Sequence, residues 1–226
     1  MHELLFLDVE TTGLDAEDRL LEVTFTVENT LYDERFKPPL PIKLGAMATH
    51  HITEKMVEDK PTFEGSELQQ NLMDYTMNDY ILVAHNAPFD MKMLDKEGVV
   101  FKRYIDTLKL SHYMDKEGDM ESHSLQYLRY YHGIELPEAI AHTGSGDVAV
   151  LEEVYKILAK DLTLEEQVEI SEMPVLYKRM NFGKAKGEKV SDMLEREPSY
   201  MRWVYETKVE KEQDENWAYT FEHYSK

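Results

Sequence analysis

The sequence predicts an α/β protein, in which a mixed sheet with three antiparallel leading strands is flanked by helices and followed by a small C-terminal appendage. Short runs of apolar and β-branched residues alternate with segments of helical periodicity. The first three strand-like runs follow one another with no helical segment between them. The chain has 226 residues and is 42% hydrophobic, which suffices for a sizeable core and argues against disorder.

The first strand is an apolar run from Leu4 that ends in two acids, and we expect it to be buried on both faces. Asp8 and Glu10 are two residues apart and therefore project to the same side. Two carboxylates on one face repel each other unless a cation lies between them, and magnesium prefers such oxygen ligands. Gly13 then turns the chain. The alternative is a strand that simply ends in a polar turn.

The next segments complete an antiparallel meander. Residues 20–27 alternate Val and Phe with Thr, residues 30–36 give a third strand, and a Pro-rich stretch ends it. Thr53 is expected to cap a short helix, and residues 63–77 to form a longer one. His50 and His51 are interpreted as a polar loop pair rather than metal ligands, because no third ligand lies at metal spacing.

A second apolar strand, residues 80–84, leads into a helix that carries a further acid. Asn86 is expected to cap this helix. Asp90, Met93 and Leu94 fall at i, i+3 and i+4, which places Asp90 on the apolar face. A carboxylate there needs a partner or a metal. Alternatively, Asp90 only complements the helix N-terminal dipole.

After a short strand at 103–106 and helices at 107–114 and 124–131, the chain reaches His142 and Asp147. The intervening Gly-Ser-Gly is expected to be a loop. Asp147 is expected to head the buried stripe of a helix that runs to about Lys160. The alternatives are an ordinary capping Asp and a surface His, although His is the side chain that titrates near neutral pH.

The composition changes after a weak boundary at residues 161–174. Residues 177–190 contain five Lys or Arg and one Glu, and residues 200–205 are rich in aromatics. A basic, Gly-containing loop beside aromatics is typical of a nucleic-acid surface. A small domain that buries its aromatics and exposes its lysines fits equally well.

The charge and the cysteine content narrow the class of protein to which this chain can belong. The chain has no Cys, which excludes disulfides and Cys-ligated zinc, and it has no apolar run long enough to span a membrane. Its N-terminal run is too short for a secretory signal, so we expect a cytoplasmic protein. The net charge of −20 argues against wrapping nucleic acid. An enzyme that grips only a chain end can instead let bound metals supply the positive charge.

Three motifs together resemble one family. They are Asp8-Val9-Glu10-Thr11-Thr12-Gly13-Leu14, His85-Asn86-Ala87-Pro88-Phe89-Asp90, and His142 followed after four residues by Asp147. In order and spacing they are similar to the DEDDh exonucleases, which include proofreading subunits, exonuclease X and oligoribonuclease. The resemblance covers about residues 1–160, so we expect an exonuclease domain over 1–172. The tail, 173–226, is similar to a small domain appended to some exonuclease X-like proteins.

The resemblance implies a ribonuclease H-like fold and 3′→5′ hydrolysis of nucleic-acid ends, with two Mg²⁺ ions and release of nucleoside 5′-monophosphates; Mn²⁺ is expected to substitute. It implies metal ligation by Asp8, Glu10, Asp90 and Asp147 and a general-base role for His142. Contacts to the terminal nucleotide are implied for Thr11, Thr12, Leu14, Asn86 and Phe89. The loop after His142 would let that residue move as substrate binds.

Further implications concern the partners and a local signature. Single-stranded or frayed 3′ ends are the expected substrate, and a polymerase or repair protein is a candidate partner. His50-His51-Ile52-Thr53 is similar to a family signature in which Gly stands where this chain has His51. The oligomeric state and the choice between DNA and RNA stay open, since no residue reads a 2′-hydroxyl unambiguously.

Three alternatives to a DNA exonuclease remain. One is an RNA exonuclease similar to oligoribonuclease. A second is a phosphatase with Asp8 as nucleophile, which Glu10 counts against because such sites carry Asp at that position. The third is a non-catalytic protein that binds nucleic-acid ends or a polymerase.

Overall fold

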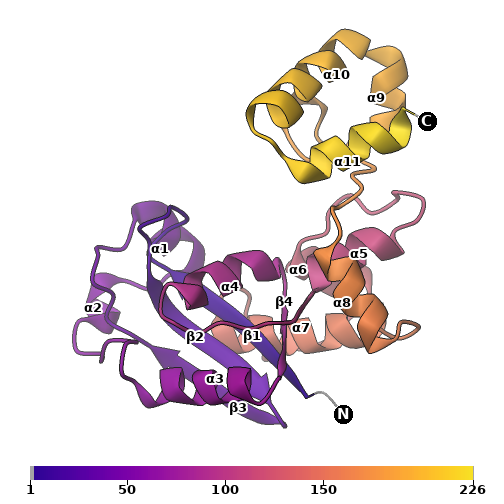
Figure 1. The fold of residues 1–226 in the computed structure, drawn as a ribbon. Helices are drawn as coiled ribbons and strands as arrows, with labels where there is room; N and C mark the ends of the chain where they lie inside the picture. Colours follow the sequence, from indigo (N-terminus) through magenta and orange to yellow (C-terminus); the bar gives the residue numbers. More distant parts are fainter. Residues whose placement is uncertain (1–2, 226) are drawn as a thin grey trace.

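A five-stranded mixed sheet forms the centre of the main body in the computed structural model, which describes residues 3–225 (Figure 1). Its strand order is β3-β2-β1-β4-β5. The strands are β1 (Leu4–Thr11), β2 (Leu20–Val27), β3 (Thr30–Arg35), β4 (Ile81–Ala84) and β5 (Tyr104–Asp106). The first three are antiparallel, β4 is parallel to β1, and β5 is parallel to β4. The predicted mixed sheet with a leading meander is confirmed.

Burial along β1 alternates instead of covering both faces. Leu5, Leu7 and Val9 are at most 6% exposed, whereas Phe6 and Asp8 are only half-buried. Phe6 packs edge-on against Tyr155, with ring centroids 5.2 Å apart. The expectation of a doubly buried strand is therefore wrong for its second face, because that face opens to solvent where the acids lie.

Eight helices surround the sheet within residues 44–172 (Figure 1). They are α1 (Leu44–His50), α2 (Glu54–Val57), α3 (Glu67–Met77), α4 (Ala87–Asp95), α5 (Thr107–Met114), α6 (Leu125–Tyr131), α7 (Gly144–Leu158) and α8 (Leu164–Glu172). Two larger apolar cores pack against the sheet, and a third, smaller one lies around α1 and α2. Helix α3 begins later than residue 63, because the Ser66 hydroxyl accepts the Gln69 N–H and caps it there. Phe63 instead packs edge-on against Phe36.

The Gly-Ser-Gly segment before Asp147 is the first turn of α7, not the expected loop. Thr143 is the N-cap, and its hydroxyl accepts the Gly146 N–H. A Cβ atom on Gly144 would lie 1.9 Å from the Thr24 hydroxyl oxygen, and one on Gly146 would lie 2.1 Å from the Ile140 carbonyl oxygen. These glycines therefore permit close packing of α7 against β2 and the preceding turn, rather than mobility of His142.

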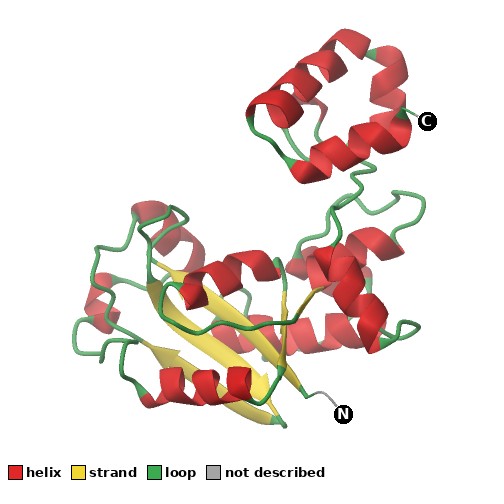
Figure 2. Cartoon of the chain, in the orientation of Figure 1, coloured by secondary structure: helices red, strands yellow, loops and turns green. Residues whose placement is uncertain are grey.

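The C-terminal residues form an all-helical unit beside the body (Figures 1 and 2). It contains α9 (Val190–Arg196), α10 (Pro198–Val204), a wider helical segment η2 (Tyr205–Lys211), α11 (Glu215–Tyr224) and the short turn η1 (Gly183–Ala185). Trp217, 1% exposed, lies at the centre of a separate apolar core. Tyr177 and Phe182 pack on its ring, as expected of core aromatics. This separate core supports the two-domain division, which remains a prediction.

Within residues 3–225, none of the helices combines the length and the apolar character that crossing a membrane would require.

A Gly144→Ala substitution should lower the free energy of unfolding by about 1–3 kcal/mol, since its methyl group would collide with Thr24 across a tight contact. Gly45→Ala is the matched control: it lies in α1 with open space around the added Cβ and should stabilise by about 0.5–1 kcal/mol. Urea unfolding of both variants measures the difference. Equal stabilities would contradict the packing role of Gly144.

Candidate active site

Three of the predicted acids meet where β1 ends beside the start of α7. Asp8 and Glu10 share one face of β1, and Asp147 lies in the first turn of α7, 8% exposed. One carboxylate oxygen from each lies within 4.8 Å of the others. Residues 139 positions apart in the chain are thus brought together, because α7 packs against β1 and β2.

The fourth acid comes from helix α4. Asp90, in the first turn of α4, is 5% exposed. Its Oδ1 accepts the backbone N–H of Val9 at 3.2 Å, between the two acids of β1. Asp90 lies outside the three-oxygen group, but its contact with the β1 backbone attaches it to the same site.

The electrostatics of this group fit a hard cation. Burial, followed by the charges of Asp90, Glu10 and Asp147, raises the pKa of Asp8 well above its usual value. Burial, with the charges of Glu22 and Asp147, raises the pKa of Glu10 to about 8. Carboxylates in this condition retain protons until a positive ion replaces them, and an oxygen-only donor set suits Mg²⁺ or Mn²⁺. The residues present therefore form a candidate divalent-metal site.

Asp147 is oriented by two donors, one of which the sequence did not reveal. The amide nitrogen of Gln126 donates to Oδ1 at 2.7 Å, and the backbone N–H of His142 donates to Oδ2 at 2.8 Å. Burial still raises the pKa of Asp147 despite these bonds. Gln126 lies on α6, far from every motif, and its polar side chain gave no sign of this contact.

Glu22 is a second residue that the sequence analysis missed. It stands opposite Glu10 in the β1–β2 register and is 3% exposed. Its Oε1 pairs with Arg35 Nε at 2.5 Å, and its Oε2 accepts the Gly144 N–H at 3.3 Å. Glu22 thus joins the N-terminus of α7 to the sheet, a position that the helix dipole favours for an acid. A Glu inside a strand that otherwise holds only apolar residues and Thr was the available signal.

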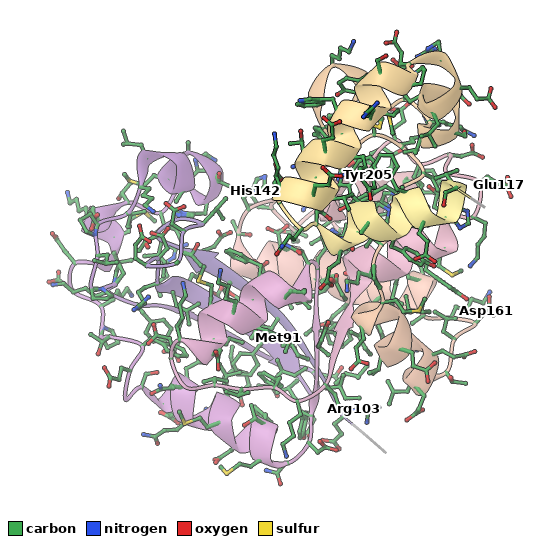
Figure 3. The ribbon with its side chains drawn as sticks, turned by 45° about the horizontal axis from the view of Figure 1, so that its top comes forward. Met91, Arg103, Glu117, His142, Asp161 and Tyr205 are labelled. Carbon is green, nitrogen blue, oxygen red and sulfur yellow. The ribbon has the colours of Figure 1, made fainter. Side chains whose placement is uncertain are left out.

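Two residues of the site have left-handed backbone conformations just before their helices. Asn86 has φ 72° and His142 has φ 60°. The Asn86 side chain makes no capping bond, contrary to expectation, while its N–H donates to Asp106 Oδ1. His142 is exposed in the turn before α7 (Figure 3). Such conformations are uncommon outside Gly, although Asn and His are enriched among the exceptions.

The histidine pair near residue 50 is not the expected polar loop pair. His50 is the last residue of α1 and is 5% exposed. Its Nδ1 accepts the Ile52 N–H at 3.0 Å, so Nε2 carries the proton and lies 3.3 Å from the Thr11 carbonyl oxygen. His51 takes the left-handed position, φ 60°, where the resembling signature has Gly. The turn is kept, and His50 supports the end of β1.

The residues predicted to contact the terminal nucleotide differ in how exposed they are. Thr11 and Thr12 are almost fully buried, and their hydroxyls donate to the Gly13 carbonyl and to Asp18. Leu14 is 80% exposed, and Phe89 packs partly against the core. The threonine hydroxyls are therefore already bonded within the turn, and contact of these residues with substrate remains a prediction.

Comparison with known proteins agrees with this geometry. The exonuclease family model matches residues 5–155. Exodeoxyribonuclease 10 of Escherichia coli K12 is 28% identical over 210 residues, which cover 89% of this chain and 90% of that protein. A DNA polymerase III subunit epsilon-like protein of Rhodobacter capsulatus is 33% identical over 66% of this chain and 22% of its own. The chain belongs to the exonuclease family and is a 3′→5′ exonuclease of the DEDDh type.

Solved structures show the same ribonuclease H-like fold. Exonuclease X in complex with 5′ overhanging duplex DNA superposes with a TM-score of 0.57 at 23% identity, over 74% of this chain and 99% of that one. E. coli exonuclease I in complex with a dT13 oligonucleotide superposes with a TM-score of 0.58 at 18% identity, over 72% of this chain and 42% of that one. The predicted fold class and family are both confirmed.

Metal-free protein should lose stability as the pH rises. The folded pKa of Glu10, about 8, lies above its ordinary value of 4.5, so the folded state binds this proton more tightly than the unfolded state. The stabilising contribution is therefore complete below pH 4.5 and lost as the pH rises to 8. Added Mg²⁺ should raise the melting temperature more at pH 8 than at pH 6, because metal binding competes with protons.

Glu10→Gln should flatten this pH dependence and weaken the response to Mg²⁺, whereas Glu34→Gln, on the exposed edge strand, should behave as wild type. Differential scanning fluorimetry with and without chelator measures both effects. A melting temperature of Glu10→Gln that responds to Mg²⁺ as the wild type does would show that the cluster is not the metal site.

Proposed function

We propose that the protein removes nucleotides from DNA 3′ ends, releasing nucleoside 5′-monophosphates, with two Mg²⁺ ions held by Asp8, Glu10, Asp90 and Asp147. The observation that carries this proposal is the close approach of three acids from β1 and α7, with Asp90 bonded to the backbone between two of them. When bound, such ions polarise the scissile phosphate and stabilise the charge that develops on its oxygens.

His142 is proposed as the general base. Its backbone N–H donates to Asp147 Oδ2, which ties this residue to the acid group, and the residue itself is exposed and accessible to water. The imidazole takes the proton of the attacking water and passes it to solvent, as a general base does. The rigid first turn of α7 supports a fixed position for this base rather than a swinging loop.

The preference for DNA rests on the relatives, which include an exodeoxyribonuclease and DNA polymerase subunits. Single-stranded or frayed 3′ ends are proposed as substrates because structural neighbours of the same fold bind an overhanging duplex and an oligonucleotide. A polymerase partner is proposed only on the strength of the epsilon-like relatives. A cytoplasmic location remains a prediction.

A gel assay of labelled single-stranded DNA, duplex DNA and RNA of one sequence tests the substrate. We expect a metal-dependent ladder that shortens from the 3′ end of DNA and that disappears with chelator or in Asp8→Asn. Faster shortening of RNA than of DNA would contradict the proposed DNA preference and support the alternative of an RNA exonuclease similar to oligoribonuclease.

His142→Ala should lower kcat by about 10²–10⁴-fold with little change in KM, because the proton acceptor is lost while the metal-binding acids are kept. His223→Ala, at an exposed position of α11, is the control and should leave kcat unchanged. A His142→Ala variant that keeps the wild-type kcat would exclude the general-base role.

A further inference from the structure

A cavity of about 450 Å³ lies where the C-terminal unit meets the body. The turn after α5, residues 115–123, extends toward the unit (Figure 1). His123 of this turn lines one wall of the cavity together with His85 and His112. The other wall comes from the segment that leads into the C-terminal unit, including Tyr177, Arg179 and Lys186. The catalytic proposal uses none of these side chains.

The cavity shares two chain segments with the active site. His85 lines the cavity, and Asn86 after it begins α4, which carries Asp90. Ser124 also lines it and caps α6, on which Gln126 donates to Asp147. The cavity is therefore linked to the acids through α4 and α6.

Charge is distributed in favour of a polyanion at this wall. Residues 173–226 contain ten Lys or Arg and ten Asp or Glu, so the whole excess of 20 negative charges lies in residues 1–172. Residues 177–190 contain five basic residues and a single Glu. The side chains of Lys178 and Arg179 donate to the carbonyl oxygens of Asp115 and Gly118, which holds this basic segment against the body. Lys186 remains exposed at the edge.

The histidine wall offers flat, uncharged rings. His112 and His123 stack with centroids 3.6 Å apart, and the Tyr177 ring meets His112 edge-on at 5.8 Å. Burial lowers the pKa of His112 to about 3 and that of His123 to about 4. The charge of Lys178 lowers both pKa values further, whereas Asp115 partly opposes the shift of His123. The rings are therefore neutral at pH 7, and neutral planar rings stack on bases regardless of sequence.

We propose that this cavity binds the single-stranded nucleic acid that precedes the terminal nucleotide, with Lys186 and the Arg179 guanidinium next to its phosphates and the histidine and tyrosine rings next to a base. This inference rests on the proposed function, because it assumes that the 3′ end lies at the acids. The C-terminal unit thereby supplies the cationic surface that the acidic body lacks. Asp115 and Glu121, also at the cavity, limit how many phosphates can bind there.

The test compares two exposed lysines that lie two residues apart. Lys186 lines the cavity, whereas Lys184 lies over the Tyr200 ring, with Nζ 4.9 Å from the ring centroid, and does not line it. Lys186→Glu and Lys184→Glu therefore make the same charge change inside and outside the proposed site. Binding of a fluorescent single-stranded DNA of about 12 nucleotides and of a dinucleotide is measured by anisotropy with Mg²⁺ over a range of salt concentrations. Every protein in this measurement also carries Asp8→Asn, which prevents hydrolysis of the strand.

We expect Lys186→Glu to weaken binding of the longer strand about tenfold and to reduce the slope of log K against log salt by roughly 0.7, the value for one lost phosphate contact. Dinucleotide binding should not change, and Lys184→Glu should stay within about twofold of wild type. Equal effects of the two variants, or an equal loss for the dinucleotide, would overturn the proposal.

Hydrolysis of the same DNA by the wild type with Mg²⁺ separates the two proposals. If the DNA is degraded from its 3′ end but the two variants bind alike, only the cavity proposal is wrong. If no substrate is degraded while Lys186→Glu alone weakens binding, the cavity binds nucleic acid and the proposed catalytic function fails.

Discussion

Mutual repulsion among carboxylates is the constraint on which the rest of the site depends. Asp8, Glu10 and Asp147 are held closer together than isolated acids would stay. Burial is the main cause that raises the pKa of all three, and neighbouring carboxylates raise the pKa of Asp8 and Glu10 further. The fold opposes the repulsion with directed donors, namely Gln126 and the His142 N–H on Asp147, and the Val9 N–H on Asp90. A site arranged in this way binds divalent cations at the expense of protons.

The backbone near the site is shaped to bring α7 close to the sheet. Gly144 leaves no room for a side chain against Thr24, and its N–H donates to Glu22, whose other oxygen pairs with Arg35. Left-handed turns at Asn86 and His142 then direct α4 and α7 so that their first-turn acids face β1. Strained turns of this kind persist where surrounding contacts hold them in place.

The division of charge between the two parts of the chain has a functional consequence. The acidic body repels polyanions except where cations are bound, which favours engagement of strand ends over wrapping. The C-terminal unit has a balanced charge, and its basic segment is held against the body. In the proposed cavity this segment would attract the strand locally. Repulsion of nucleic acid by the body, together with attraction at the proposed cavity, would favour contact with strand ends over contact along the rest of the strand.

The local sequence pattern by itself determined several element bounds and the family of this protein. Strand β2 and helix α5 have the bounds that alternation and helical period predicted, and the order of the four acids with His142 identified the family, because period, caps and short motifs are properties of neighbouring residues. Only the tertiary structure decided that Gly144 starts a helix, that His50 is buried, and that Glu22 and Gln126 serve the site. Those outcomes depend on contacts between segments distant in the chain, such as α7 on β2 and α6 on α7, and no local sequence pattern specifies the space that remains between such segments.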